Sequence, residues 1–190
     1  YYSRFSNYFG TVIKGFFYDE PYLSFGFPWT ERLPAEFQRK KGYDLLDVLP
    51  VMMINVQNCD SKELRTYMDD YFDVWTAMAA ENFYGVLAHW CENHGVELSG
   101  HMDLDHHLNT LSTVSGHFYR NMKHNTRPAV DVIWAQIEPG MFTDFPRYAG
   151  SAKRLMGRGH AVSETFAGMG QGLYGDLMRY ITDHQAIRGI

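Results

Sequence analysis

The sequence is poor in cysteine and contains no long apolar segment. Its two cysteines, Cys59 and Cys91, stand in unrelated surroundings, so the pattern indicates neither a disulfide framework nor a zinc knuckle. No run of 18 apolar residues is present, which gives a membrane span no support. No signal segment opens the chain, whose first residue is Tyr1 rather than Met. These features alone leave the compartment open.

Clustered positive charge is also scarce. The net charge is −5, and the only basic cluster is the short Arg39-Lys40-Lys41, so we expect neither nucleic acid nor a membrane surface as a partner. The composition, 45% hydrophobic and 21% charged, is typical of a globular domain with one sizeable core. An aromatic content of 16% is high, which suggests exposed stacking surfaces as well as a core, and sugar-binding clefts are one place where such rings occur.

Apolar runs of strand length alternate with helical patterns along the chain. The four predicted strands are Thr11–Tyr18, Val96–Ser99, Val130–Gln136 and His160–Ser163, with a fifth beginning in Gln185–Ile190. The predicted helices are Glu31–Lys41, Asp44–Val48, Ser61–His94, Pro146–Met156 and Leu173–Thr182. Such an alternation predicts a parallel sheet whose chemistry lies at the C-terminal ends of the strands.

The position of the glycines favours a barrel over an open sheet. An open doubly wound fold usually has a glycine-rich first turn, whereas here the only such stretch, Gly168–Gly172, follows the last full strand and lacks the dinucleotide-binding spacing. We therefore predict an α/β fold, a partial (β/α)8 TIM barrel with long helices between parallel strands. We expect residues 1–190 to be a single fragment of a catalytic barrel domain, truncated at both ends, with unpaired edge strands.

Two glutamates follow predicted strands at the expected mouth of this barrel. Glu20 lies in "GFFYDEP" and Glu164 in "VSETFAG". Glycoside hydrolysis uses two carboxyl groups, one protonated to assist the leaving oxygen and one ionised as base or nucleophile. The aromatic residues before Glu20 favour its protonated form, which suits the acid. The alternative is that Asp19 and Glu20 open a solvated loop.

Several longer stretches resemble one enzyme family. "DEP" is similar to the Asn-Glu-Pro with which many barrel glycosidases present their acid on the fourth strand. The segments "PWTERLPAEFQRKKGYDLLDVLP", "HWCENHGVELSGH" and "AVSETFAG" resemble the catalytic barrel of glycoside hydrolase family 106, the α-L-rhamnosidases, over most of the chain. The resemblance implies that the four strands are numbers four to seven and that Gln185–Ile190 leads into the eighth, so the chain would be the C-terminal half of a barrel.

The resemblance also implies an activity and a site. The protein would be a glycosidase acting on an oligosaccharide, a polysaccharide or a glycoside, with Glu20 as general acid and Glu164 as base or nucleophile. This chemistry requires no cofactor, although the family suggests calcium at the sugar, for which Asp19, Glu20 and Asp103 are the nearest oxygen donors. The other half of the barrel, in the parent chain, would be a partner, and an extracellular or periplasmic location is favoured. Sugar specificity and stereochemistry stay open.

Other side chains near the strand ends are candidates for contact with the sugar. Those able to hydrogen-bond to its hydroxyls are Asp19, His101, Asp103 and Gln136. Those able to stack on a sugar ring are Trp29, Trp134 and Phe166, although a ring at such a position more often belongs to the core.

The histidine-rich segment "GHMDLDHHLNT" supports an alternative. His101, Asp103, Asp105 and His106 form a set that zinc would accept, so a metal-dependent hydrolase is a second hypothesis, with Asp103, Asp105 and His106 as weak metal candidates. Against it, the adjacent His106 and His107 point in different directions, and Asp105 could instead cap a helix. A non-catalytic, sugar-binding relative is the third hypothesis.

Overall fold

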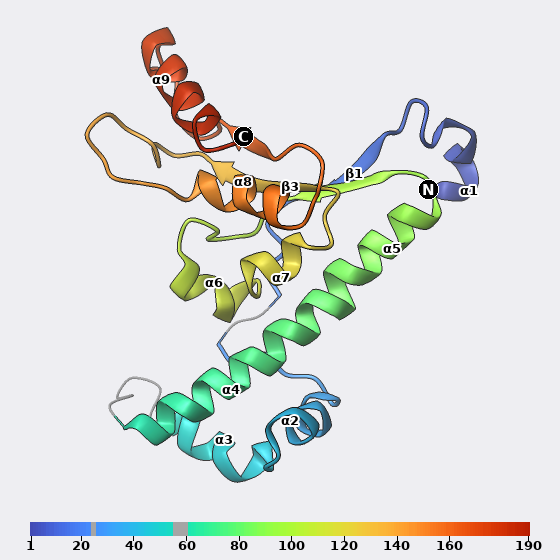
Figure 1. The fold of residues 1–190 in the computed structure, drawn as a ribbon, viewed down its shortest axis with the longest axis vertical. Coiled ribbons are helices and arrows are strands. Elements are labelled where there is room, and N and C mark those ends of the chain that lie inside the picture. The colour runs from blue at the N-terminus through green and yellow to red at the C-terminus, as the bar shows by residue number, and fades with distance from the viewer. Residues whose placement is uncertain (24–25, 55–60) are drawn as a thin grey trace.

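The computed structural model describes residues 1–23, 26–54 and 61–190. Four parallel strands, in the order β1-β2-β3-β4, form a curled half-barrel flanked by helices (Figure 1). The strands are β1 (Gly15–Tyr18), β2 (Glu97–Gly100), β3 (Arg127–Val132) and β4 (Val162–Thr165). This arrangement confirms the predicted fold class.

The strand register decides which side chains become neighbours at the C-terminal edge of the sheet. Tyr18 at the end of β1 pairs with Gly100 at the end of β2. Asp131 of β3 pairs with Glu164 of β4. Because all four strands run the same way, the residues that follow them emerge at one edge.

The long helix predicted between the first two strands is confirmed. It consists of α4 (Lys62–Ala79), one π-helical segment η2 (Ala80–Tyr84) and α5 (Gly85–Asn93). The Ser61 hydroxyl caps it by accepting a hydrogen bond from the Leu64 amide at 3.1 Å, and Gly95 with φ 67° follows its end. The helices α2 (Leu33–Lys41) and α3 (Leu45–Ile54) pack against its first half, away from the sheet (Figure 1).

The prediction that the helix after Asp44 stops before Pro50 is wrong. Helix α3 continues through Pro50 to Ile54, because Leu45, Val48 and Met52 are buried on one side of it. These residues belong to a separate apolar cluster with α2 and α4, and its packing outweighs the single hydrogen bond that proline removes. The helices α2, α3 and α4 thus form a helical segment with a core of its own.

Contacts of Arg120 join this helical segment to the barrel. The Arg120 guanidinium donates to the Asp73 carbonyl at 2.7 Å and to the Thr76 hydroxyl at 2.8 Å, and contacts the Asp73 carboxylate at 2.5 Å. Lys41 binds the same carboxylate at 2.7 Å. These two cations lower the pKa of Asp73 to about 2.

The ends of the predicted strands differ from those observed. The amides of Thr11, Val12 and Ile13 all donate to the Tyr8 carbonyl, so these residues form a tight turn and β1 begins only at Gly15. Strand β3 ends at Val132 instead of Gln136, because Trp134 and Ala135 have positive φ angles and turn the chain.

The predicted fifth strand at Gln185–Ile190 is wrong. Helix α9 (Gly175–Ala186) extends past the predicted end at Thr182 and includes Gln185. The Gln185 carbonyl then accepts from the amides of Arg188 and Ile190, which keeps the last residues coiled.

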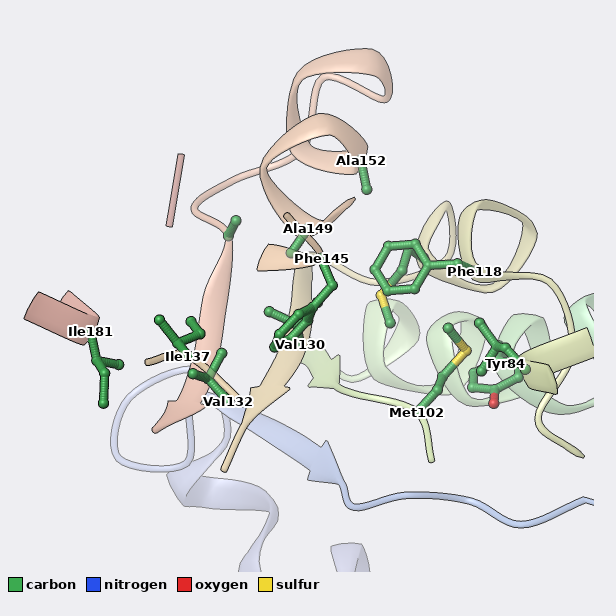
Figure 2. Close-up of a cluster of buried hydrophobic side chains, with 13 residues drawn as sticks. Tyr84, Met102, Phe118, Val130, Val132, Ile137, Phe145, Ala149, Ala152 and Ile181 are labelled. Carbon is green, nitrogen blue, oxygen red and sulfur yellow. The ribbon is translucent and has the colours of Figure 1, made fainter. Parts of the chain in front are cut away.

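The remaining helices complete the outer layer. They are α1 (Tyr2–Phe5), the 3₁₀ helix η1 (Ser6–Tyr8), α6 (Leu108–Val114), α7 (Phe118–Met122) and α8 (Pro146–Leu155). Figure 2 shows the core between α7, α8 and the sheet, where Phe118, Val130 and Phe145 are buried. None of the helices in the described ranges is both long and apolar enough to span a bilayer. Cys91 is a buried free thiol, whereas Cys59 lies outside the described residues.

Candidate active site

His101 lies at the centre of a group of carboxyl groups. It directly follows β2, and its side chain is buried. Its Nε2 lies 3.1 Å from Glu164 Oε2 and 3.3 Å from Asp19 Oδ1. With a proton on Nε2, the imidazole donates to these oxygens. His101 therefore lies between the carboxyl groups of Asp19 and Glu164. Its contact with a sugar stays a prediction.

Glu20 and Asp131 form the other half of this group. One oxygen of each lies within 4.8 Å of the other and of a ring nitrogen of His101. Asp131 is buried, and burial, followed by a hydrogen bond with the Glu20 side chain, raises its pKa to about 7, although His101 opposes the shift. Acidic side chains of β3, β4 and the loop after β1 thus meet around the histidine that follows β2.

Asp131 was not among the predicted site residues. The available signal was an acidic residue inside the otherwise apolar stretch "PAVDVIW", since a carboxyl group in a buried strand needs a partner or a function. Asp105 holds the backbone of Asp131 in place. The Asp105 side chain is buried, and its Oδ2 accepts a hydrogen bond from the Asp131 amide at 2.9 Å. Burial raises the pKa of Asp105 well above its usual value. Asp105 therefore positions β3 and is not the helix cap that the sequence also allowed.

Each of the four strands is followed by a residue with an unusual backbone. Among the described residues, the non-glycine positions with positive φ angles are Glu20 (44°), Leu104 (58°), Trp134 (49°), Ala135 (58°) and Phe166 (77°). Such conformations are costly for side chains with a Cβ atom and concentrate at functional sites. Here they occur after the strand ends that carry the acidic group.

Trp134 lies exposed at this edge, in contact with the loop after β4. Its side chain is 70% exposed, and its amide donates to the Ala167 carbonyl at 3.1 Å. A Cβ atom at Gly168 would come within 1.8 Å of the Trp134 ring, so the indole lies directly against the Gly168 backbone. Phe166, in contrast, is half-buried and packs against the main core.

The other predicted residues belong to neither group of side chains with metal-ligand spacing around His101. Trp29 is exposed and follows Pro28, whose carbonyl accepts a hydrogen bond from Tyr71. Gln136 is held by its own loop, with Oε1 accepting from the Ile133 amide at 2.9 Å and Nε2 3.2 Å from His106 Nδ1. Asp103 is half-buried, and its charge acts on Asp105 and His106.

The structure does not bring the predicted zinc ligands together. In the described part of the chain, two groups of side chains have metal-ligand spacing, namely Asp19, His101 and Glu164, and Glu20, His101 and Asp131. Neither contains Asp103, Asp105 or His106. The Asp105 side chain accepts a hydrogen bond from the Asp131 amide, and His106 lies beside Gln136.

The fold of the chain resembles that of a known protein. The chain is similar in structure to a rhamnosidase from Novosphingobium sp. PP1Y, with a TM-score of 0.69 and 16% sequence identity. The match covers 93% of this chain but only 17% of that protein, so the likeness concerns the fold of one portion. No curated protein sequence matches the chain.

A family model decides the assignment. The model of glycoside hydrolase family 106, described as alpha-L-rhamnosidase, matches residues 18–190, from the last residue of β1 to the end of the chain. The match includes every acidic residue of the group around His101. The chain therefore belongs to glycoside hydrolase family 106, the alpha-L-rhamnosidases.

Proposed function

We propose that this chain carries the catalytic carboxyl groups of a glycosidase of the α-L-rhamnosidase kind, acting on a carbohydrate substrate. The observation that supports this most strongly is the meeting of Asp19, Glu20, Asp131 and Glu164 around His101 at one edge of the sheet. Glycoside hydrolysis requires two carboxyl groups in different protonation states. A group of four acidic side chains, one buried and three partly or largely exposed, offers such a difference.

In this proposal Glu20 is the general acid and Glu164 its partner. Glu20 gives its proton to the glycosidic oxygen as the bond from that oxygen to the anomeric carbon breaks. Glu164 takes a proton from a water that attacks the anomeric carbon, or attacks that carbon itself if the enzyme retains configuration. The contact of 3.1 Å from His101 fixes the orientation of the Glu164 carboxylate for either role.

Calcium fits this set of side chains in part. The buried Oδ1 of Asp131 has no hydrogen-bond partner, and the carboxylates of Asp19 and Glu20 lie nearby as further oxygen donors. Calcium prefers such ligands, whereas the nitrogen of His101 does not suit it. We propose Asp19, Glu20 and Asp131 as its ligands, in place of the set with Asp103. When bound, calcium would supply a positive centre that holds sugar hydroxyl groups.

The other half of the barrel is part of the proposal. Strands β1 and β4 are the edges of the sheet, and Phe17 of β1 is 52% exposed. We propose that further strands of the parent protein pair with these edges and complete the substrate cleft. An extracellular or periplasmic location stays a prediction.

Two matched substitutions in the full-length parent protein test the function. We expect Glu20→Gln and Glu164→Gln each to lower kcat on an aryl α-L-rhamnoside by about 10²- to 10⁴-fold. Glu138→Gln, at an exposed position in the loop after β3, serves as control and should keep the wild-type rate. An unchanged rate in either glutamate variant removes that residue from catalysis. Binding of rhamnosides without turnover by the wild type would instead favour a non-catalytic, sugar-binding relative.

A further inference from the structure

The turn that carries Glu20 is fixed on both sides. Before it, Tyr18 pairs with Gly100, and its hydroxyl donates to Asn125 Oδ1 at 3.0 Å. After it, the Pro21 carbonyl accepts a hydrogen bond from the Ser115 hydroxyl at 3.1 Å. Only Asp19 and Glu20 lie between these two anchors.

A second bond strengthens the anchor after the turn. The Leu23 amide donates to the Val114 carbonyl at 3.1 Å, so both ends of Pro21–Leu23 are tied to the residues that end α6. Helix α6 follows β2, whereas Pro21–Leu23 follows β1. The attachment therefore joins the loops of two neighbouring strands.

Ser115 is itself held rigidly. It is fully buried, and its amide donates to the Leu111 carbonyl at 2.9 Å. Its carbonyl accepts from the Tyr84 hydroxyl at 3.2 Å and from Asn121 Nδ2 at 2.9 Å. Tyr84 ends the π-helical segment of the long helix, and such segments are frequent at functional sites. Because the Ser115 amide and carbonyl are both hydrogen-bonded, the position of this buried residue is fixed.

The anchors explain the backbone of Glu20. Its φ angle of 44° lies in the left-handed region, which a residue with a Cβ atom adopts only where the surrounding structure imposes it. The fixed Tyr18 and the fixed Pro21 impose it here, and the Glu20 carboxyl group consequently points to Asp131 and His101.

We propose that Ser115 is a positioning residue for Glu20. This rests on the proposed function, in which Glu20 donates the proton to the leaving oxygen. The Ser115 hydroxyl holds the Pro21 carbonyl, and thereby sets where the Glu20 carboxyl group meets the glycosidic bond. Without this hydroxyl, the turn relaxes and the proton is delivered less efficiently, because catalysis is sensitive to displacements of about 1 Å.

Two substrates whose leaving groups differ in basicity can distinguish a misplaced general acid from a general loss of structure. The 2,4-dinitrophenolate group leaves a rhamnoside without being protonated, whereas the more basic 4-methoxyphenolate group needs a proton from the general acid. In the full-length protein we expect Ser115→Ala to lower kcat on the 4-methoxyphenyl substrate by roughly 10- to 100-fold. The rate on the dinitrophenyl substrate should change less than about threefold. Thr113→Ala, which loses only a hydroxyl bond to the Thr110 carbonyl of its own helix, is the control and should match the wild type on both.

A second variant covers the case in which Ser115→Ala does not fold. Tyr84→Phe keeps the buried ring and removes only the hydroxyl that bonds the Ser115 carbonyl, and should show the same selectivity to a smaller extent. Equal losses on both substrates, or no loss on either, would overturn the positioning role. Glu20→Gln run in parallel tests the proposed function itself. If Glu20→Gln shows the leaving-group dependence but Ser115→Ala and Tyr84→Phe do not, only the positioning role of Ser115 is rejected. If Glu20→Gln shows no such dependence, the acid role of Glu20 is rejected.

Discussion

His101 Nε2 lies 3.1 Å from Glu164 Oε2, although the two residues are 63 positions apart in the sequence. The same nitrogen lies 3.3 Å from Asp19, so one buried imidazole joins the first strand to the fourth. The ring is buried, whereas the side chains of Asp19 and Glu164 are 73% and 41% exposed, so His101 contacts both acids from the buried side.

Replacing His101 should therefore disturb the site more than the fold of distant parts. We expect His101→Ala to lower kcat on an aryl α-L-rhamnoside by about 100-fold, because Glu164 and Asp19 lose their common donor and repel each other. Steady-state kinetics of the full-length protein check this. His107→Ala, at an exposed position of the same segment, is the matched control, and an equal loss in both variants would contradict the prediction.

Asp131 should make stability depend on pH. Its pKa in the folded protein is raised to about 7 from 3.8, so between these values the folded state binds more protons than the unfolded state. The contribution of Asp131 to stability therefore falls as pH rises through this window. Asparagine at position 131 has no such dependence. We expect the Tm of Asp131→Asn, relative to wild type, to rise between pH 4 and pH 8.

Thermal unfolding in EDTA measures this difference without any contribution from bound calcium. Asp47→Asn, an exposed acid on α3, is the control and should follow the wild type across the range. A constant gap between Asp131→Asn and wild type would show that Asp131 is not held protonated in the folded protein.

Two glycines allow a strict test of Trp134 as a sugar platform. Gly168 and Gly170 both have positive φ angles, 66° and 75°, but only a Cβ atom at Gly168 meets the Trp134 ring. Gly168→Ala and Gly170→Ala therefore cause similar backbone strain, and only the former displaces the indole. We expect Gly168→Ala to raise KM for the rhamnoside about fivefold and Gly170→Ala to leave it near wild type, since aromatic contacts contribute about 1 kcal/mol. Equal KM values in the two variants would exclude this role.

Arg120 should stabilise the junction between the helical segment and the barrel. We expect Arg120→Met to lower the free energy of unfolding by about 1 kcal/mol, because the contacts with Asp73 and Thr76 are lost but partly exposed. The pKa of Asp73 is lowered to about 2, so its share of this stability is present above pH 3.8 and is lost as pH falls through 2. Urea unfolding at pH 7 and at pH 2 should show a smaller gap at the lower pH. Arg39→Met, whose ion pair lies within α2, is the control.

Local patterns were sufficient for much of the fold. The long helix was predictable because its apolar residues recur with a helical period and Ser61 and Gly95 mark its ends. The parallel sheet followed from the alternation of strands and helices. The errors occurred where packing overrides local preference: Pro50 lies inside α3 because its neighbours are buried, and Gln185 continues a helix.

Part of the candidate site is also predictable. The sequence predicts Glu20 and Glu164 as a catalytic pair because each follows or ends an apolar run, and this role stays a prediction. The resemblance to family 106 is visible in continuous stretches of sequence, and the family model confirms it. Asp131 was missed, since its importance depends on neighbours from other strands. His101 was identified as a site residue, but not as a buried support for two carboxylates.

The sequence by itself thus determined the family, the alternation of strands and helices, and the presence of acidic residues near the strand ends, because these are properties of short segments. The tertiary structure alone decided which acids meet. The register that pairs Asp131 with Glu164, the burial of His101, and the anchoring of Pro21 by Ser115 all join residues far apart in the chain. Such contacts depend on how the strands associate, and no local pattern encodes the distance between two side chains.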